Sequence, residues 1–113
     1  MDPRNTTLAE RLIDYSVELK PGEIIYIEIK GLEALDLGKE LVRLAALRGG
    51  IPFWYYNDES LSRNFIRHAG AEQFAAWGKF HRPVMEAVDA YIGVRGSTNP
   101  FDLADVDAEH MKG

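Results

Sequence analysis

One segment constrains the fold of this chain more than any other, the run 23–29 that directly follows Pro21-Gly22. It is rich in β-branched residues and hydrophobic at nearly every position, a pattern typical of a strand that is covered on both faces. Two later runs, 51–56 and 90–94, show the same continuous hydrophobicity. Because such strands are typical of parallel sheets, the sequence predicts an α/β fold, a three-layer sandwich with a small, mostly parallel sheet flanked by helices.

The stretches between these runs have the apolar spacing of helices. Thr7 and Glu10 stand at capping-box spacing, which predicts a first helix that begins at Thr7. A second helix is expected over 32–48, and a third over 59–68 after an Asn-Asp cap. The apolar side chains expected to face inward from the third helix are Leu61, Phe65 and Ile66.

The last part of the chain is less regular. Breaks at Gly78 and Pro83 predict two short helices over 71–88. A loop or short helix is expected over 101–106, followed by a helix over 107–112. One turn of helix is too short to be stable alone, and three strands are few for a self-sufficient sheet. We therefore expect residues 1–113 to form a single α/β domain of a longer protein.

Composition excludes several classes of function. The 113 residues suffice for one domain, and 13 Lys and Arg against 18 Asp and Glu leave a net charge of −5. This charge does not fit a general nucleic-acid binder or a protein that attaches to acidic membranes. No apolar run is long enough for a membrane span, and there is no Cys for disulfides, thiolate metal sites or nucleophiles. These features fit a cytoplasmic protein.

Motifs for metal or nucleotide chemistry are missing from the sequence. The three histidines lack metal-ligand spacing, and we interpret each as a partly exposed group near a helix end. The acidic run 102–109 lacks the glycine of a calcium loop. No G-x-G-x-x-G fingerprint follows the first strand, so Gly31 is interpreted as a turn residue and Gly38 as a close helix contact. The aromatic residues are expected in the core, namely 53–56, Phe74, Trp77 and Phe80.

The loop 95–100 is the best local candidate for a ligand site, because open parallel sheets bind ligands outside the carboxyl ends of their strands. Arg95 offers a fork of donors for a carboxylate, and Asn99 could orient a polar group. The alternative is structural: Arg95 pairs with a carboxylate of the fold, and Asn99-Pro100 turns the chain.

Three segments taken in order carry a family resemblance. They are 8–16 (LAERLIDYS), 19–23 (LKPGE) and 89–96 (DAYIGVRG), followed by the Asn99-Pro100 loop. In this order they resemble the amino-terminal domain of the thermophilic metallo-aminopeptidases, the aminopeptidase T family, which includes AmpS and PepS. The resemblance spans nearly all of the chain.

The resemblance implies a longer, two-domain enzyme. In that family an α/β amino-terminal domain precedes a carboxyl-terminal catalytic domain, in which a two-metal site accepts zinc or cobalt-type divalent ions. The enzymes are generally homodimers and remove amino-terminal residues from peptide substrates. The family's metal ligands lie in the catalytic domain, and none of their motifs occurs in this chain. We therefore assign no catalytic residue and no metal ligand here.

Two hypotheses for the chain follow. The first is a non-catalytic domain, inactive alone, that packs on its own catalytic domain and helps enclose the active site, with Arg95 and Asn99 as candidates for lining that enclosure. The second is a stand-alone α/β module that binds a small ligand or a nucleotide. A weaker third hypothesis, a self-contained metal hydrolase, requires His68 and His81 to converge in space.

Overall fold

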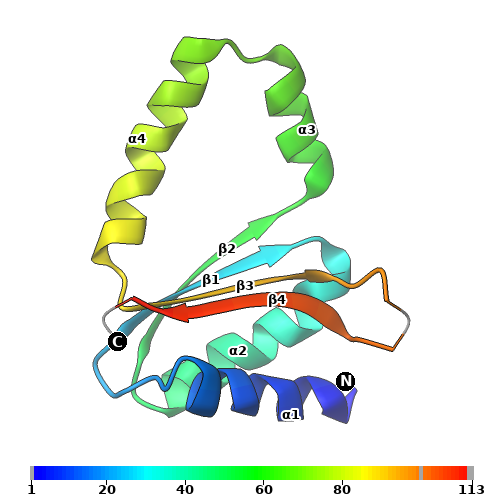
Figure 1. Ribbon diagram of the computed structural model, residues 1–113, viewed down its shortest axis with the longest axis vertical. Coiled ribbons are helices and arrows are strands. Elements are labelled where there is room, and N and C mark those ends of the chain that lie inside the picture. Colours follow the sequence, from blue (N-terminus) through cyan, green and yellow to red (C-terminus); the bar gives the residue numbers. More distant parts are fainter. Residues whose placement is uncertain (1, 100, 112–113) are drawn as a thin grey trace.

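The computed structural model describes residues 2–99 and 101–111, and Figure 1 shows how its elements are arranged. In chain order the elements are α1 (Pro3–Arg11), the π-helical turn η1 (Leu12–Ser16), β1 (Ile24–Lys30), the 3-10 turn η2 (Leu32–Ala34), α2 (Leu35–Leu47), β2 (Ile51–Asn57), α3 (Glu59–His68), α4 (Ala71–Ala87), β3 (Ala90–Gly96) and β4 (Ala104–His110). The strand order is β2-β1-β3-β4, with β1 parallel to β2 and β3, and β4 antiparallel to β3. The prediction of an α/β fold with a mostly parallel sheet is confirmed.

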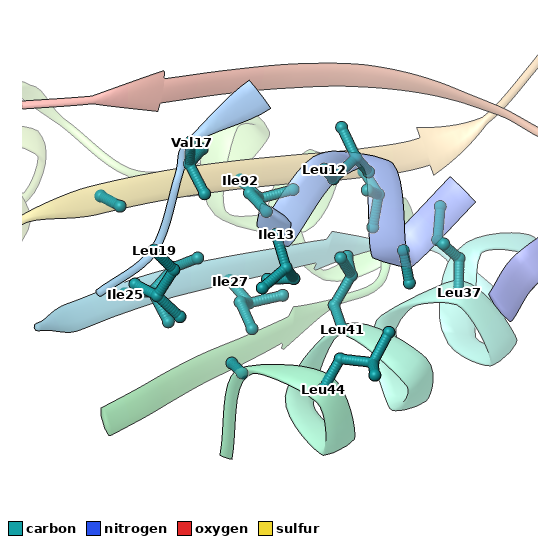
Figure 2. Packing of buried hydrophobic residues seen from close by; sticks show 14 of the residues in the cluster. Leu12, Ile13, Val17, Leu19, Ile25, Ile27, Leu37, Leu41, Leu44 and Ile92 are labelled. Carbon is teal, nitrogen blue, oxygen red and sulfur yellow. The ribbon is translucent and has the colours of Figure 1, made fainter. Parts of the chain in front are cut away.

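A hydrophobic core lies between the sheet and the helices α1 and α2, and Figure 2 shows its side chains. Ile25, Ile27 and Ile29 occupy alternate positions of β1, so they share the face that points toward these helices. None of the three is more than 3% exposed. The other members of the core cluster are Ala9, Leu12, Ile13, Val17, Leu19, Ala34, Leu37, Leu41, Leu44, Ala45, Ala90, Ile92 and Val94.

The connecting helices lie on opposite faces of the sheet. The chain passes from β1 to β2 through α2, and then returns across β1 to β3 through α3 and α4. Because crossovers between parallel strands are almost always right-handed, this reversal places α3 and α4 on the face away from α2. The ring of His81 in α4 accordingly lies against the ring of Tyr26, with their centroids 6.1 Å apart. From there α3 and α4 project away from the sheet as a pair, which we call the α3–α4 arm (59–87) (Figure 1).

The first helix begins earlier than the capping-box spacing predicts, so that prediction is wrong. Asp2 is the N-cap, since its side chain accepts a hydrogen bond from the backbone N–H of Arg4 at 2.9 Å. Pro3 follows at the first helical position, where its missing N–H costs nothing. Thr7 lies inside the helix, and its hydroxyl donates to the carbonyl oxygen of Pro3.

Two predictions for the second half of the chain are also wrong. Residues 71–87 form one helix, α4, which continues through Gly78 and Pro83. Residues 104–110 form the strand β4 instead of a loop and a helix, because antiparallel pairing with β3 satisfies their backbone groups. Alternate β4 side chains reach the core, and Val106 packs against it. Lys112, which the predicted helix includes, lies outside the described residues.

The aromatic side chains predicted to lie in the core are largely exposed, which corrects that prediction. In β2 the exposed fraction is 55% for Phe53 and 62% for Trp54, because this strand stands at one end of the strand order. The arm helices contact each other through Phe65 and Phe74, whose ring centroids are 5.1 Å apart. Further exposed apolar side chains on β2 and the arm are Ile51, Tyr55, Tyr56, Leu61, Ile66, Phe74, Trp77, Phe80 and Val84. The prediction that Leu61 and Ile66 face inward is therefore also wrong. Over residues 2–99 and 101–111 no helix has the length and apolar character needed to cross a membrane.

The contact between α2 and β1 leaves no room for a side chain at Gly38. A Cβ there would overlap the buried side chain of Ile29. We expect Gly38→Ala to lower the free energy of unfolding by about 1–3 kcal/mol, as overpacking does in other cores. Urea unfolding measures this change.

Gly78→Ala is the matched control, because Gly78 is also helical but has nothing within 4 Å of the place of its Cβ. Helix propensity predicts a gain of about 1 kcal/mol for this variant. If both variants changed stability in the same direction, close contact at Gly38 would be contradicted.

Candidate functional site

A hollow of about 930 Å³ lies at the carboxyl ends of β1, β2 and β3, beside the α3–α4 arm, and we call it the strand-end hollow. In open parallel sheets ligands bind at this edge, where the path of the chain across the sheet reverses; here the reversal lies between β1 and β3. The residues that line it are Glu28, Lys30, Gly31, Leu32, Glu33, Asn57, Asp58, Glu59, Ser60, Ser62, Arg63, Trp77, Arg95, Gly96 and Ser97.

Two cationic side chains stand next to each other on the sheet side of the strand-end hollow. Lys30 ends β1 and Arg95 lies near the end of β3, and the register makes them Cα partners. Each has a carboxylate at 3.5 Å, Glu28 for Lys30 and Asp105 for Arg95. Lys30 and Arg95 also line a second, smaller hollow of about 320 Å³ between β3 and β4. They therefore form the wall that the two hollows share.

Gly31 makes the sharp exit from β1 at this edge. Its φ of 90° lies in the region that favours glycine, and its N–H donates to the carbonyl oxygen of Asn57 at 2.9 Å. This bond ties the end of β1 to the end of β2. The interpretation of Gly31 as a strand-to-helix turn is confirmed.

The first turn of α3 forms the opposite wall. Asp58 is the N-cap, and its carboxylate accepts hydrogen bonds from the backbone N–H of Ser60 at 2.8 Å and from the Ser60 hydroxyl at 2.6 Å. These hydrogen bonds hold the pKa of the Asp58 carboxyl below its usual value. Arg63, one turn further on, lies 3.5 Å from Glu59. The α3 wall thus presents charges of both signs.

Two tyrosines and a glutamate occupy the face of the sheet next to the hollow. The rings of Tyr26 and Tyr91 stack with centroids 6.0 Å apart, and the Tyr91 hydroxyl donates to Oε2 of Glu28 at 3.3 Å. Burial raises the pKa of both tyrosines to about 12, and the negative charge of Glu28 adds to the shift. Gly93 leaves space for the Tyr91 side chain, with which a Cβ there would collide.

Of the two residues predicted to form the ligand site, one lines the strand-end hollow and the other does not. Arg95 lines the strand-end hollow and also pairs with Asp105, as the structural alternative requires. Asn99 is exposed and is not part of the lining. Its side-chain oxygen accepts from the N–H of Phe101 at 3.0 Å, and its own N–H donates to the Ser97 hydroxyl at 3.0 Å. Pro100 lies outside the described residues, and the role of Arg95 and Asn99 in enclosing a substrate stays a prediction.

Other lining residues were not identified from the sequence. Lys30 could have been found, because the rule that singles out Arg95 at the end of one strand applies equally to the strand beside it. Asp58 was identified only as a helix cap. Trp77 was assigned to the core, and no sequence signal shows that its helix projects from the sheet.

The model of the thermophilic metalloprotease (M29) family matches residues 1–113. The chain belongs to this family. Among solved structures it is similar to wild-type AmpT from Thermus thermophilus, with 28% sequence identity and a TM-score of 0.50. That match covers 64% of this chain and 18% of the Thermus chain, so the similar region is under a fifth of that protein. No curated protein sequence matches the chain.

The described residues of this M29 family member do not fit the metal centre that the family description implies. No three His, Asp or Glu side chains come together as metal ligands over 2–99 and 101–111. The ring of His81 stacks on Trp77 with centroids 5.1 Å apart, His68 Nδ1 lies 2.8 Å from the carbonyl oxygen of Asn64, and His110 Nε2 lies 2.8 Å from Glu23 Oε2. His68 and His81 belong to no ligand group in this part of the chain, so we assign no metal-dependent step to them.

The raised pKa values of Tyr26 and Tyr91 predict a loss of stability in alkali. Protonated tyrosine is favoured in the folded state, so this contribution is complete below the unfolded pKa of about 10 and disappears as the pH rises through about 12. Absorbance at 295 nm should show two of the five tyrosines titrating near pH 12. Tyr91→Phe should remove one of these two late steps, and a wild-type titration complete by pH 11 would contradict the burial of the pair.

Proposed function

We propose that this chain is the amino-terminal, non-catalytic domain of a longer metal-dependent aminopeptidase, which removes amino-terminal residues from peptides. The observation that carries the proposal is the M29 family match over 1–113 together with similarity to only 18% of the Thermus AmpT chain. The described residues offer no group of metal ligands, so in this proposal the divalent ions, zinc or cobalt in type, are held by a catalytic domain on the same polypeptide.

The domain's own contribution is to pack on the catalytic domain and help enclose its active site. The exposed aromatic side chains of β2 and of the arm supply apolar area of the kind that is buried at domain interfaces, and Trp54 and Phe80 are the most exposed of them. The strand-end hollow supplies a charged wall, and Arg95 is the residue we place nearest the substrate. Peptide substrates, a homodimeric enzyme and a cytoplasmic location belong to the same proposal.

A second candidate function, a stand-alone module that binds a small ligand, is favoured by one observation. The strand-end hollow has the size of ordinary small-molecule sites, which range over about 300–1,000 Å³. It also lies at the edge where parallel sheets bind ligands. The M29 family match gives no support to this second function, so we rank it below the first.

The intact mass of the native protein separates the two functions. The protein would be captured from cell extract with an antibody raised against this chain, and its mass measured under denaturing conditions. We expect a mass several-fold above 12.7 kDa, and release of amino-terminal residues from peptides that stops when divalent metal is removed. A mass near 12.7 kDa would overturn the proposed domain role and favour the binding module.

A further inference from the structure

The strand β2 is an edge of the sheet that carries no charge. In the described part of the chain no strand lies beyond it, and residues 51–57 include no Lys, Arg, Asp or Glu. The opposite edge strand, β4, carries Asp105, Asp107 and Glu109 at alternate positions. Charges on an edge strand hinder pairing with a further strand. The edge of β4 is therefore protected against such pairing, whereas the edge of β2 is open to it.

Hydrogen bonds at the two ends of β2 show which of its backbone groups point outward. The N–H of Ile51 donates to the carbonyl oxygen of Glu23 at 2.8 Å. At the other end, the carbonyl oxygen of Asn57 accepts from the N–H of Gly31 at 2.9 Å. Because residues of a strand bond alternately to its two sides, the odd-numbered residues of β2 face β1. The even-numbered residues thus direct their N–H and C=O groups away from the sheet.

The even-numbered residues of β2 are Pro52, Trp54 and Tyr56. Proline has no N–H, and within a sheet it is tolerated where an edge strand faces outward, which is where Pro52 lies. Trp54 and Tyr56 each offer an N–H donor and a carbonyl acceptor on the outer side. These two residues set the length of edge with which a further strand can pair.

The side chains along this edge are apolar on both faces of the sheet. Phe53 is the register partner of Tyr26 and shares its face, whereas Trp54 is the partner of Ile27 on the core face. Both side chains are exposed, and the proposed function buries such aromatic side chains against the catalytic domain. Protein that covers both faces also excludes water from the outward backbone groups between them, and these groups then need hydrogen-bond partners. A strand alongside β2 supplies donors and acceptors at the required spacing.

We infer that an extended segment of the catalytic domain pairs with the outer edge of β2 and adds a strand to the sheet at Trp54 and Tyr56. The segment is uncharged where it faces β2, and its apolar side chains pack beside Phe53 and Trp54. The inference rests on the proposed function, in which the catalytic domain belongs to the same polypeptide. It goes further in naming the contact that joins the two domains and in making it backbone pairing.

Hydrogen–deuterium exchange of the native protein, resolved to single residues, tests this pairing. The inward N–H groups of Phe53 and Tyr55 pair with β1 whether or not the outer edge is covered, so they are the internal reference. We expect the outward N–H groups of Trp54 and Tyr56 to exchange within about ten-fold of this reference. An uncovered edge would let the outward groups exchange more than about 100-fold faster than the inward ones.

Two substitutions of Trp54 separate the backbone contribution from that of the side chain. Trp54→Pro removes the outward N–H and leaves the bonds to β1, as Pro52 does at the preceding outward position. Trp54→Ala, the matched control, removes the same ring but keeps the N–H. We expect exchange at Tyr56 to be about ten-fold faster in Trp54→Pro than in Trp54→Ala. Unchanged exchange at Tyr55 shows that both variants still pair with β1.

Fast exchange at the outward positions of the native protein would overturn the inference, and so would equal rates at Tyr56 in the two variants. Protection that disappears on dilution would mean that a second copy of the chain covers the edge, which also overturns it. A long native protein with fast outward exchange rejects this inference alone, whereas a native mass near 12.7 kDa rejects the proposed function.

Discussion

The parallel pairing of β1 with both of its neighbours is the constraint on which the rest of the structure depends. Ile25, Ile27 and Ile29 fill one face of this central strand, and Gly38 lets α2 approach so closely that the side chain of Ile29 occupies the space of a Cβ. Because parallel strands need crossovers, α2 must lie on one face and the arm on the other. The reversal between β1 and β3 then produces the strand-end hollow.

The two faces of the sheet consequently differ. One is sealed by α1 and α2 over the hydrophobic core, as Figure 2 shows, whereas the other carries Tyr26, Tyr91 and Glu28 and contacts α4 through His81. The arm extends from this second face and exposes aromatic side chains. These exposed side chains supply the surface that the proposed domain role requires.

The sequence predicts the parts of this fold that rest on local hydrophobicity. The continuous apolar runs identify β1, β2 and β3, and Asp58 identifies the start of α3. The sequence-based predictions fail where the environment of a residue depends on the arrangement of distant segments in the fold. The exposure of Trp54 depends on the place of β2 in the strand order, and β4 forms only because β3 offers it a partner. At the site, Arg95 was identified from its own strand, but Lys30 becomes its neighbour only through the register of two strands.

The central claim, that the carboxyl edge of β1 and β3 is the working surface of the domain, is tested most directly by hydrogen–deuterium exchange. The native protein, free of divalent metal, would be compared with and without a saturating unblocked peptide. The account predicts added protection at 30–33, at 95–97 and in the first turn of α3, with α1 and the amino-terminal half of β1 unchanged. Protection that left these three segments unaffected would contradict it.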